Sequence, residues 1–339
     1  MPAQLTELKV QDVAIKLHRA GRGPSVLFLH GAGGVPQWLP FFDVLAERYE
    51  LLVPEHPGFG GSDDPPWIHS MPDLAMFYLD LVEEAGLDRI QLIGNSLGGW
   101  LAAEILIRDR SRFRSLVQLA PAGIRAKGVP CGDNFIWGPE EAVRNLYHDQ
   151  AFADRILALT PSEAQLDVML KNRFTVAKLG WQPRWFNPDL EKWLHRIKLP
   201  ALVVWGDDDK IMPPANAALW RERLPDARLV MVKECGLSRM SSRPLLSRGM
   251  SASSLREPRH EARLLPSHAS LGGLFWLATI ARSVPWRQRH ACLGYQELIA
   301  GDNSWKSTAN GRTYYRSPHD RKKLARIDNH QGRRGALRQ

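Results

Sequence analysis

The feature that most restricts the fold of this chain is an alternation of short apolar runs with segments of helical periodicity. Apolar runs lie at 25–30 (SVLFLH), 49–54 (YELLVP) and 89–94 (RIQLIG). Such runs are typical of strands buried on both faces of a parallel sheet. The segments between them, 35–49 and 72–85, carry apolar residues at helical spacing. This βαβαβ order predicts an α/β fold with a mostly parallel, doubly wound sheet.

The strand pattern stops after residue 122 and returns near residue 199. Between these points the sequence has helical segments and no strand signal. The sheet resumes at 201–206 (ALVVWG) and ends with 227–232 (ARLVMV). We therefore predict an α/β core made of residues 1–122 and 199–236, with a helical cap insertion at 123–198.

The composition changes abruptly after Gly236. Residues 237–339 contain 16 Arg and 3 Lys against 3 Asp and 3 Glu, whereas the first 236 residues contain 26 basic and 30 acidic residues. The basic excess of the chain therefore belongs to its C-terminal part. This part also lacks a clean helix or strand period, apart from an apolar stretch at 271–280 (LGGLFWLATI). We predict an irregular basic tail, either disordered or translated out of frame.

A Gly-x-Ser-x-Gly motif lies at 94–98, directly after an apolar run and at the start of a helical segment. A serine in this context sits on a sharp strand-to-helix turn that lifts its hydroxyl clear of the backbone. The helix N-terminus there favours a developing negative charge. The motif predicts Ser96 as a nucleophile, and the alternative is a glycine-rich turn with a bystander serine.

A second glycine-rich turn, HGAGG at 30–34, follows the strand predicted at 25–29. Glycines allow backbone N–H groups to approach a reacting carbonyl closely, because no Cβ intervenes. Alone, the turn is equally consistent with a plain tight turn. Together with the serine motif, it predicts an oxyanion hole formed by the N–H groups of Ala32 and Leu97.

With the segment EHPGFGGSD at 55–63, these turns resemble the α/β-hydrolase family in its capped form, over residues 1–236. The resemblance implies a triad of serine, acid and histidine. Its acid follows the next-to-last strand in a G-x-x-D-x-x-x-P pattern, which Asp209 and Pro213 match in WGDDDKIMP. The alternative is a solvated acidic loop.

The serine motif and a predicted cap arginine, Arg173, also resemble the carbon–carbon bond hydrolases of aromatic catabolism. In that subfamily the resemblance implies contact between the arginine and a substrate carboxylate. The alternative is a solvated helix arginine.

The triad histidine implied by the resemblance is absent from its expected place. The family has a Gly-His pair after the last strand, but here Gly236 is followed by Leu237. Another histidine could serve, the protein could have dispensed with one, or the reading frame could have slipped. Residues 239–243 can be encoded by codons that read Pro-His-Val-Glu-Pro in the neighbouring frame. We predict severely reduced turnover, and a sheet without the helix that normally closes one face.

The resemblance implies a serine hydrolase acting on a small carboxylic ester, lactone or carbon–carbon (diketone) substrate, without a metal or other cofactor. The alternative is a non-catalytic capped α/β domain that binds a small apolar ligand. The three cysteines form no CxxC pair, so neither a disulfide framework nor a zinc site is indicated.

Partners and compartment follow from what the sequence does not carry. No apolar run reaches the roughly 18 residues that span a bilayer, and the first residues lack a secretory pattern. We expect a cytoplasmic protein without membrane attachment. The basic tail has no aromatic interleaving, so no nucleic-acid partner is predicted. The oligomeric state stays open.

Overall fold

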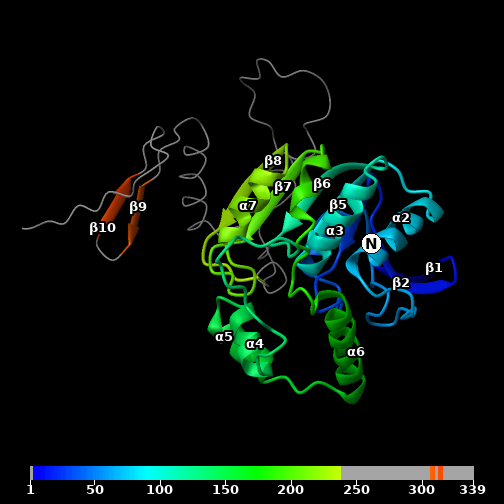
Figure 1. The fold of residues 1–339 in the computed structure, drawn as a ribbon. Coiled ribbons are helices and arrows are strands. Elements are labelled where there is room, and N and C mark those ends of the chain that lie inside the picture. The colour runs from blue at the N-terminus through cyan, green and yellow to red at the C-terminus, as the bar shows by residue number, and fades with distance from the viewer. Residues whose placement is uncertain (1–2, 238–305, 310–311, 316–339) are drawn as a thin grey trace, which may run out of the picture. The chain divides into compact units, whose positions relative to one another are not determined.

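An eight-stranded sheet forms the centre of the computed structural model, which describes residues 3–237, 306–309 and 312–315 (Figure 1). The strands are β1 (Gln4–Val10), β2 (Val13–Ala20), β3 (Ser25–Leu29), β4 (Glu50–Pro54), β5 (Ile90–Asn95), β6 (Phe113–Leu119), β7 (Ala201–Gly206) and β8 (Ala227–Val232). Their order is β1-β2-β4-β3-β5-β6-β7-β8. β2 pairs antiparallel with β1 and β4, and every other neighbouring pair is parallel. The predicted mostly parallel α/β sheet is confirmed.

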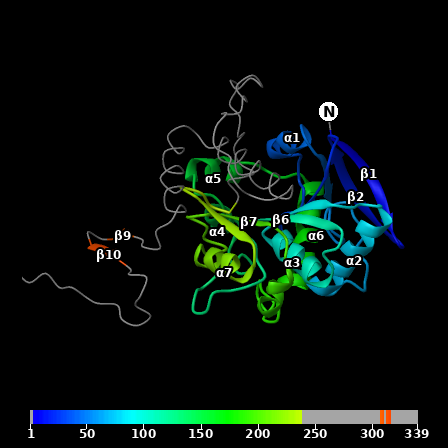
Figure 2. The same cartoon turned by 90° about the horizontal axis from the view of Figure 1, so that it is seen from above.

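Helices cover both faces of this sheet. α1 (Pro40–Ala46) lies on one face, and α2 (Met71–Glu84), α3 (Leu97–Arg108) and α7 (Ala215–Arg223) lie on the other (Figure 2). Side chains alternate between the two cores along each strand. In β3, Val26 and Phe28 pack in the core under α1, whereas Leu27 and Leu29 pack under α2 and α3. The sheet is therefore doubly wound, as predicted.

The start of α2 shows how local sequence sets a helix boundary. The Ser70 hydroxyl accepts a hydrogen bond from the backbone N–H of Asp73 at 3.3 Å, and Pro72 lies in the first turn. Both features favour helix initiation. The apolar period beyond them packs against α3, so the helix predicted from periodicity is confirmed.

The segment between β6 and β7 (residues 120–200), here called the insertion, is helical. It contains α4 (Pro139–Leu146), α5 (Gln150–Leu157), α6 (Glu163–Gly180) and a 3₁₀ helix, η1 (Glu191–Arg196). α4, α5 and α6 lie to one side of the sheet, below it in Figure 1. The sequence did not predict α5, because this helix spans only eight residues, fewer than the roughly 11–18 over which a helical period is distinctive. It predicted a helix at 188–197, where the chain forms the tighter η1.

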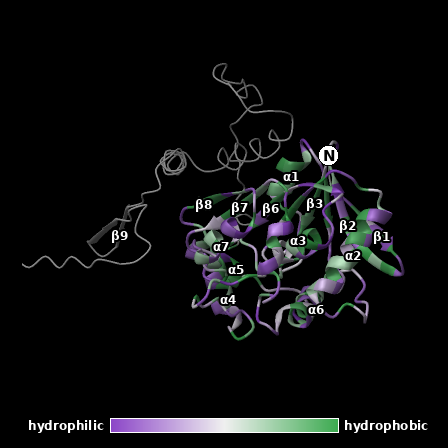
Figure 3. Ribbon diagram, turned by 45° about the horizontal axis from the view of Figure 1, so that its top comes forward, coloured by the Kyte–Doolittle hydropathy of each residue, from purple (hydrophilic) through white to green (hydrophobic). Residues whose placement is uncertain are grey.

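The sheet is less well covered at β8 than at its centre. Every residue of β8 is at least partly exposed, whereas β7 is buried throughout. Val230 and Val232 pack at the margin of the core under α1. Apolar residues otherwise concentrate along the central strands and α3 (Figure 3). None of the helices in the described part of the chain is long and apolar enough to cross a membrane.

Residues 306–309 and 312–315 belong to a second unit, separate from the one that contains the sheet. These residues form an antiparallel pair, β9 (Lys306–Ala309) and β10 (Arg312–Tyr315), within the tail predicted to be irregular. The other tail residues, including the apolar stretch at 271–280 and the segment at 239–243, lie outside the described residues.

Candidate active site

Ser96 lies on the turn between β5 and α3. Its backbone has φ 52° and ψ −112°, a left-handed conformation that is strained for a residue with a Cβ. Its N–H donates to the carbonyl of Leu119 on β6 at 2.9 Å, and its carbonyl accepts from the N–H groups of Gly99 and Trp100. The side chain is 7% exposed, and its hydroxyl does not cap the helix. The structure therefore holds the Ser96 hydroxyl at a helix N-terminus without committing it to the backbone.

Three glycines make this turn possible. A Cβ at Gly94 would lie 2.4 Å from the carbonyl oxygen of Gly98, and a Cβ at Gly98 would lie 2.1 Å from that of Leu29. A Cβ at Gly99 would meet the Gln118 side chain at 2.6 Å. These distances are shorter than van der Waals contact, so strand, turn and helix pack this closely only with glycine.

The turn at 30–34 lies against the serine. A Cβ at Gly31 would be 3.4 Å from the Cβ of Ser96. The N–H of Gly34, which has φ 76°, donates to the carbonyl of Gly31 at 3.1 Å and closes the turn around Ala32. The sequence predicted that this turn lies close to Ser96. The roles of the Ala32 and Leu97 N–H groups as oxyanion donors stay a prediction.

Two buried histidines support this turn without offering a base. The rings of His30 and His56 stack with centroids 3.6 Å apart. His30 Nε2 accepts the N–H of His56 at 3.0 Å, so Nδ1 carries the proton and donates to the carbonyl of Gly31 at 2.8 Å. Burial lowers the pKa of His30 to about 4 and that of His56 well below its ordinary value. Both rings are therefore neutral, and both nitrogens of His30 are occupied.

Asp209 follows β7, at the same edge of the parallel sheet as Ser96 after β5. It is 4% exposed, and its Oδ1 accepts the N–H groups of Ile211 and Met212 at 2.9 and 2.8 Å. Its Oδ2 is buried and has no hydrogen-bond partner among the described residues. Burial raises the pKa of Asp209 to about 7; the two N–H groups lower it, and nearby Asp208 raises it. The side chain is thus not a solvated loop residue.

The chain leaves β8 beside the insertion and the loop that carries Asp209. A Cβ at Gly236 would lie 2.8 Å from the carbonyl oxygen of Leu146, and the carbonyl of Cys235 accepts the N–H of Asp208 at 3.1 Å. Leu237, which stands where the resemblance implies histidine, is partly buried against the core. An apolar side chain therefore occupies this position.

A histidine that the sequence analysis did not consider lies near this point. His148, between α4 and α5, contacts Asp208 with 2.7 Å between Nδ1 and Oδ2, and both side chains are about 40% exposed. A Cβ at Gly236 would be 3.1 Å from its backbone nitrogen. No local pattern relates residue 148 to residue 208, so only the packing of the insertion reveals this pair.

Arg173 lies on α6 with an exposed side chain. One of its guanidinium nitrogens donates to the carbonyl of Phe135 at 3.2 Å. This hydrogen bond joins two parts of the insertion. The predicted contact between Arg173 and a substrate carboxylate stays a prediction.

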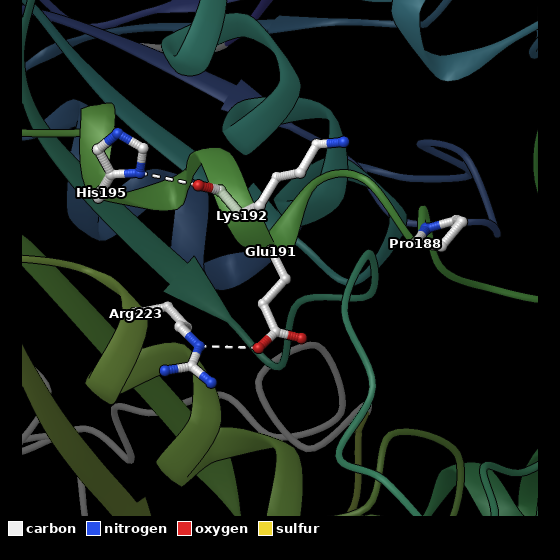
Figure 4. A pocket seen from close by; sticks show the side chains of 5 residues that line it. All are labelled: Pro188, Glu191, Lys192, His195 and Arg223. Carbon is white, nitrogen blue, oxygen red and sulfur yellow. Dashed lines mark hydrogen bonds and ion pairs between the residues drawn. The ribbon is translucent and has the colours of Figure 1, made fainter.

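A groove elsewhere on the molecule lacks these features. It has a volume of about 440 Å³ and lies where η1 meets the end of α7, lined by Pro188, Glu191, Lys192, His195 and Arg223 (Figure 4). Glu191 pairs with Arg223 at 2.8 Å. None of the lining residues belongs to the turn at Ser96 or the loop at Asp209, so we do not assign the active site to this groove.

Comparisons with known proteins agree with the fold. The model of the alpha/beta hydrolase family matches residues 26–246. The 2-hydroxy-6-oxo-2,4-heptadienoate hydrolase of Pseudomonas putida is 25% identical over 238 residues, covering 66% of this chain and 86% of that protein. The 2-hydroxy-6-oxononadienedioate/2-hydroxy-6-oxononatrienedioate hydrolase of Paraburkholderia phymatum is 29% identical over 251 residues, covering 66% and 85%.

Solved structures show the same architecture. A serine hydrolase from the polyaromatic-hydrocarbon-degrading bacterium Cycloclasticus zankles superposes with a TM-score of 0.59 at 22% identity, covering 71% of this chain and 93% of that one. At this identity the likeness concerns the fold alone. The family model, by contrast, spans most of the sequence and includes both the serine turn and the aspartate loop. The chain belongs to the alpha/beta hydrolase family.

Proposed function

We propose that this chain is a serine hydrolase scaffold whose triad lacks its histidine. Ser96 attacks a carbonyl carbon, the N–H groups of Ala32 and Leu97 hold the oxyanion, and Asp209 orients a histidine base. The observation that carries this proposal is the buried, unpartnered Oδ2 of Asp209. A buried carboxylate oxygen without a donor is costly, and an imidazole N–H is the donor that a triad would supply.

The unpartnered Oδ2 of Asp209 also supports the proposal that this chain hydrolyses its substrate slowly. Ser96 has no histidine partner within residues 3–237, so this part of the chain supplies no base to accept its proton. Oxyanion stabilisation and substrate binding alone leave only a residual acceleration. We further propose that the chain from Leu237 onward is an out-of-frame tail, because the composition changes at the residue where the base should stand. Sequencing the coding DNA from independent isolates tests this, and an intact single frame in all of them would reject it.

The substrate class we propose is a small carboxylic ester, lactone or diketone, cleaved under a cap formed by residues 123–198. By their names, the relatives reported above are hydrolases of 2-hydroxy-6-oxo-2,4-heptadienoate and of 2-hydroxy-6-oxononadienedioate or -trienedioate. The proposed cap exposes several apolar side chains, including Phe174 and Trp181. These would suit an apolar substrate entering above Ser96. We place the enzyme in the cytoplasm.

The substitution Leu237→His tests the proposal directly. A histidine here would follow Gly236 in the order the family uses and could donate to Oδ2 of Asp209. We expect kcat/KM for p-nitrophenyl acetate to rise at least about 100-fold, the size of a general-base contribution. Leu237→Gln is the matched control, since it is polar but cannot act as a base. Adding Ser96→Ala to the Leu237→His chain should abolish the increase in kcat/KM. Equal rates for Leu237→His and Leu237→Gln would reject the assignment of Ser96 and Asp209 to a triad.

A fluorophosphonate probe separates this proposal from the alternative of a non-catalytic domain that binds a small apolar ligand. Covalent labelling requires an activated serine, whereas ligand binding does not. We expect Leu237→His to label at Ser96 faster than the parent chain. Failure of both chains to label would favour the binding domain.

A further inference from the structure

Asn172 on α6 joins the insertion to the turn that lies against Ser96. Its side chain is 6% exposed. Nδ2 donates to the carbonyl of Gly33 at 3.2 Å, and Oδ1 accepts the N–H of Gly60 at 2.9 Å. The packing is close, since a Cβ at Gly34 would lie 2.7 Å from Nδ2. One buried amide therefore connects three segments that are distant in sequence.

Other residues of α6 hold only the second of these loops. Lys171 Nζ donates to the carbonyls of Gly60 and Ser62 at 3.0 and 2.6 Å, and Thr175 Oγ1 donates to that of Gly58 at 2.7 Å. Within the described residues of α6, Asn172 alone hydrogen-bonds the turn at 30–34. α6 is thus fastened to the loop at 58–62 by several bonds, but to the serine-side turn by one.

The contact requires an amide. The Gly33 carbonyl needs a donor and the Gly60 N–H needs an acceptor, and a primary amide supplies both from one side chain. A carboxylate could keep the bond to Gly60 but could not donate to Gly33. Asn172 itself is buried, whereas Gly33 is exposed and Gly60 partly exposed, so losing the amide removes the fixed partner that each of these two backbone groups has on α6.

Fixing the Gly33 carbonyl fixes the peptide plane between Gly33 and Gly34. The N–H of Gly34 closes the turn onto Gly31, the residue that contacts Ser96. The orientation of the Ala32 N–H, one residue earlier, depends on the same turn. We propose that Asn172 is a positioning residue for the oxyanion turn and couples the seating of α6 to the alignment of the Ala32 N–H. This role rests on the proposed function.

Asn172→Asp tests the proposal, with Thr175→Val as the matched control one turn away. Both variants are measured in the parent chain and in the Leu237→His chain. We expect Asn172→Asp to lower kcat for p-nitrophenyl acetate about tenfold with KM within about twofold, since a misaligned donor weakens the transition state more than substrate binding. Thr175→Val should change kcat by less than about twofold. Equal losses in both variants would overturn the specific role.

The pH dependence of kcat distinguishes a loss of this hydrogen bond from a general loss of structure. A protonated carboxyl can donate to Gly33 and accept from Gly60, so it reproduces the amide. The ratio of Asn172→Asp to parent kcat should therefore rise as the pH falls from about 8 to about 5. A flat ratio would count against the donor role of Asn172.

A third measurement does not depend on turnover. Hydrogen exchange of the peptide spanning residues 29–35 should quicken in Asn172→Asp and stay unchanged in Thr175→Val. Unchanged exchange in Asn172→Asp would overturn the proposal even if the chain is inactive. If neither the parent chain nor the Leu237→His chain shows turnover that depends on Ser96, the proposed function is rejected instead. Failure of the Asn172 proposal can therefore be told apart from failure of the proposed function.

Discussion

At the residue scale, the serine turn combines a strained backbone at Ser96 with packing so close that three neighbouring positions must be glycine. A positive φ at Ser96 costs of order 1–3 kcal/mol and persists only where its surroundings enforce it. The hydrogen bonds to Leu119, Gly99 and Trp100 and the close approach of three glycines provide that enforcement. The strain is therefore a property of the whole junction between β5, α3 and β6.

Gly98→Ala should disrupt this junction, because the new Cβ would lie 2.1 Å from the carbonyl oxygen of Leu29. We expect the free energy of unfolding to fall by about 3 kcal/mol or more, as for severe overpacking. Gly33→Ala is the control, since nothing lies within 4 Å of a Cβ there. Urea denaturation of both variants measures the difference, and similar losses would contradict the packing argument.

Asp209 should make stability depend on pH. Its pKa is raised from 3.8 to about 7 in the folded chain, so between these values the folded state binds more protons than the unfolded state. Stability should therefore fall as the pH rises from about 4 to about 7, by roughly 2–4 kcal/mol. Asp209→Asn should remove this part of the pH dependence.

Denaturant unfolding at several pH values tests this prediction by the difference between parent and Asp209→Asn. Ser96→Ala introduces no titrating group and should keep the parent profile. A constant difference between parent and Asp209→Asn from pH about 4 to about 7 would show that the raised pKa is not expressed in stability.

At the element scale, α3 is tied to the point where the insertion returns to the core. Glu104 on α3 is fully buried, and its carboxylate accepts hydrogen bonds from Trp100 at 3.0 Å, Asn187 at 2.8 Å and Arg108 at 2.6 Å. Asn187 lies after α6, and its N–H donates to the carbonyl of Gly123 at 2.9 Å. One carboxylate thus organises the start and end of the insertion.

Glu104→Ala should destabilise the protein by about 2–3 kcal/mol, because it leaves the buried Trp100 N–H without its acceptor and removes an acceptor from the partly buried Asn187 and Arg108. Glu140→Ala on α4 removes an exposed pair with Arg144 and should cost less than about 1 kcal/mol. Thermal and urea unfolding of the two variants provide the comparison. A small effect of Glu104→Ala would mean that water replaces the lost acceptor.

At the scale of the whole molecule, the helices of residues 3–237 cover the two faces of the sheet unequally near β8. α2, α3 and α7 pack on one face, whereas α1 packs on the other, away from β8. Val230 and Val232 remain partly exposed on that face. This is where a closing helix of the family would bury apolar surface.

Replacing residues 238–339 with the segment that follows the last strand in the Pseudomonas putida relative should therefore stabilise the chain. Burial of about 200 Å² of apolar surface contributes about 5 kcal/mol, which corresponds to a Tm rise of roughly 10 °C. The same graft with its apolar residues changed to Ser serves as the control. Equal Tm values for the two grafts would contradict the expected packing on β8.

The sequence allowed the sheet to be predicted because its signals are local. Buried strands appear as continuous apolar runs, and α2 is indicated by the helical spacing of its apolar residues and by Ser70 and Pro72 at its start. α5 was not predicted because it spans only eight residues, too few for a distinctive period. The 3₁₀ form of η1 was not predicted because it differs from an α-helix in its hydrogen bonds, which the spacing of apolar residues does not record. The motif that ends in Pro213 indicated Asp209, but the sequence did not predict the burial and hydrogen bonds of its side chain.

The sequence by itself determined the order of the central strands and the turn at Ser96, since each is encoded within a few consecutive residues, and it predicted Asp209 as the acid. Only the tertiary structure decided that Oδ2 of Asp209 has no donor in the described part of the chain, that His30 is held neutral, and that His148 contacts Asp208. It also placed Asn172 against Gly33, 139 residues away. Desolvation and hydrogen bonding depend on what the whole fold packs around a group, which no short stretch of sequence records.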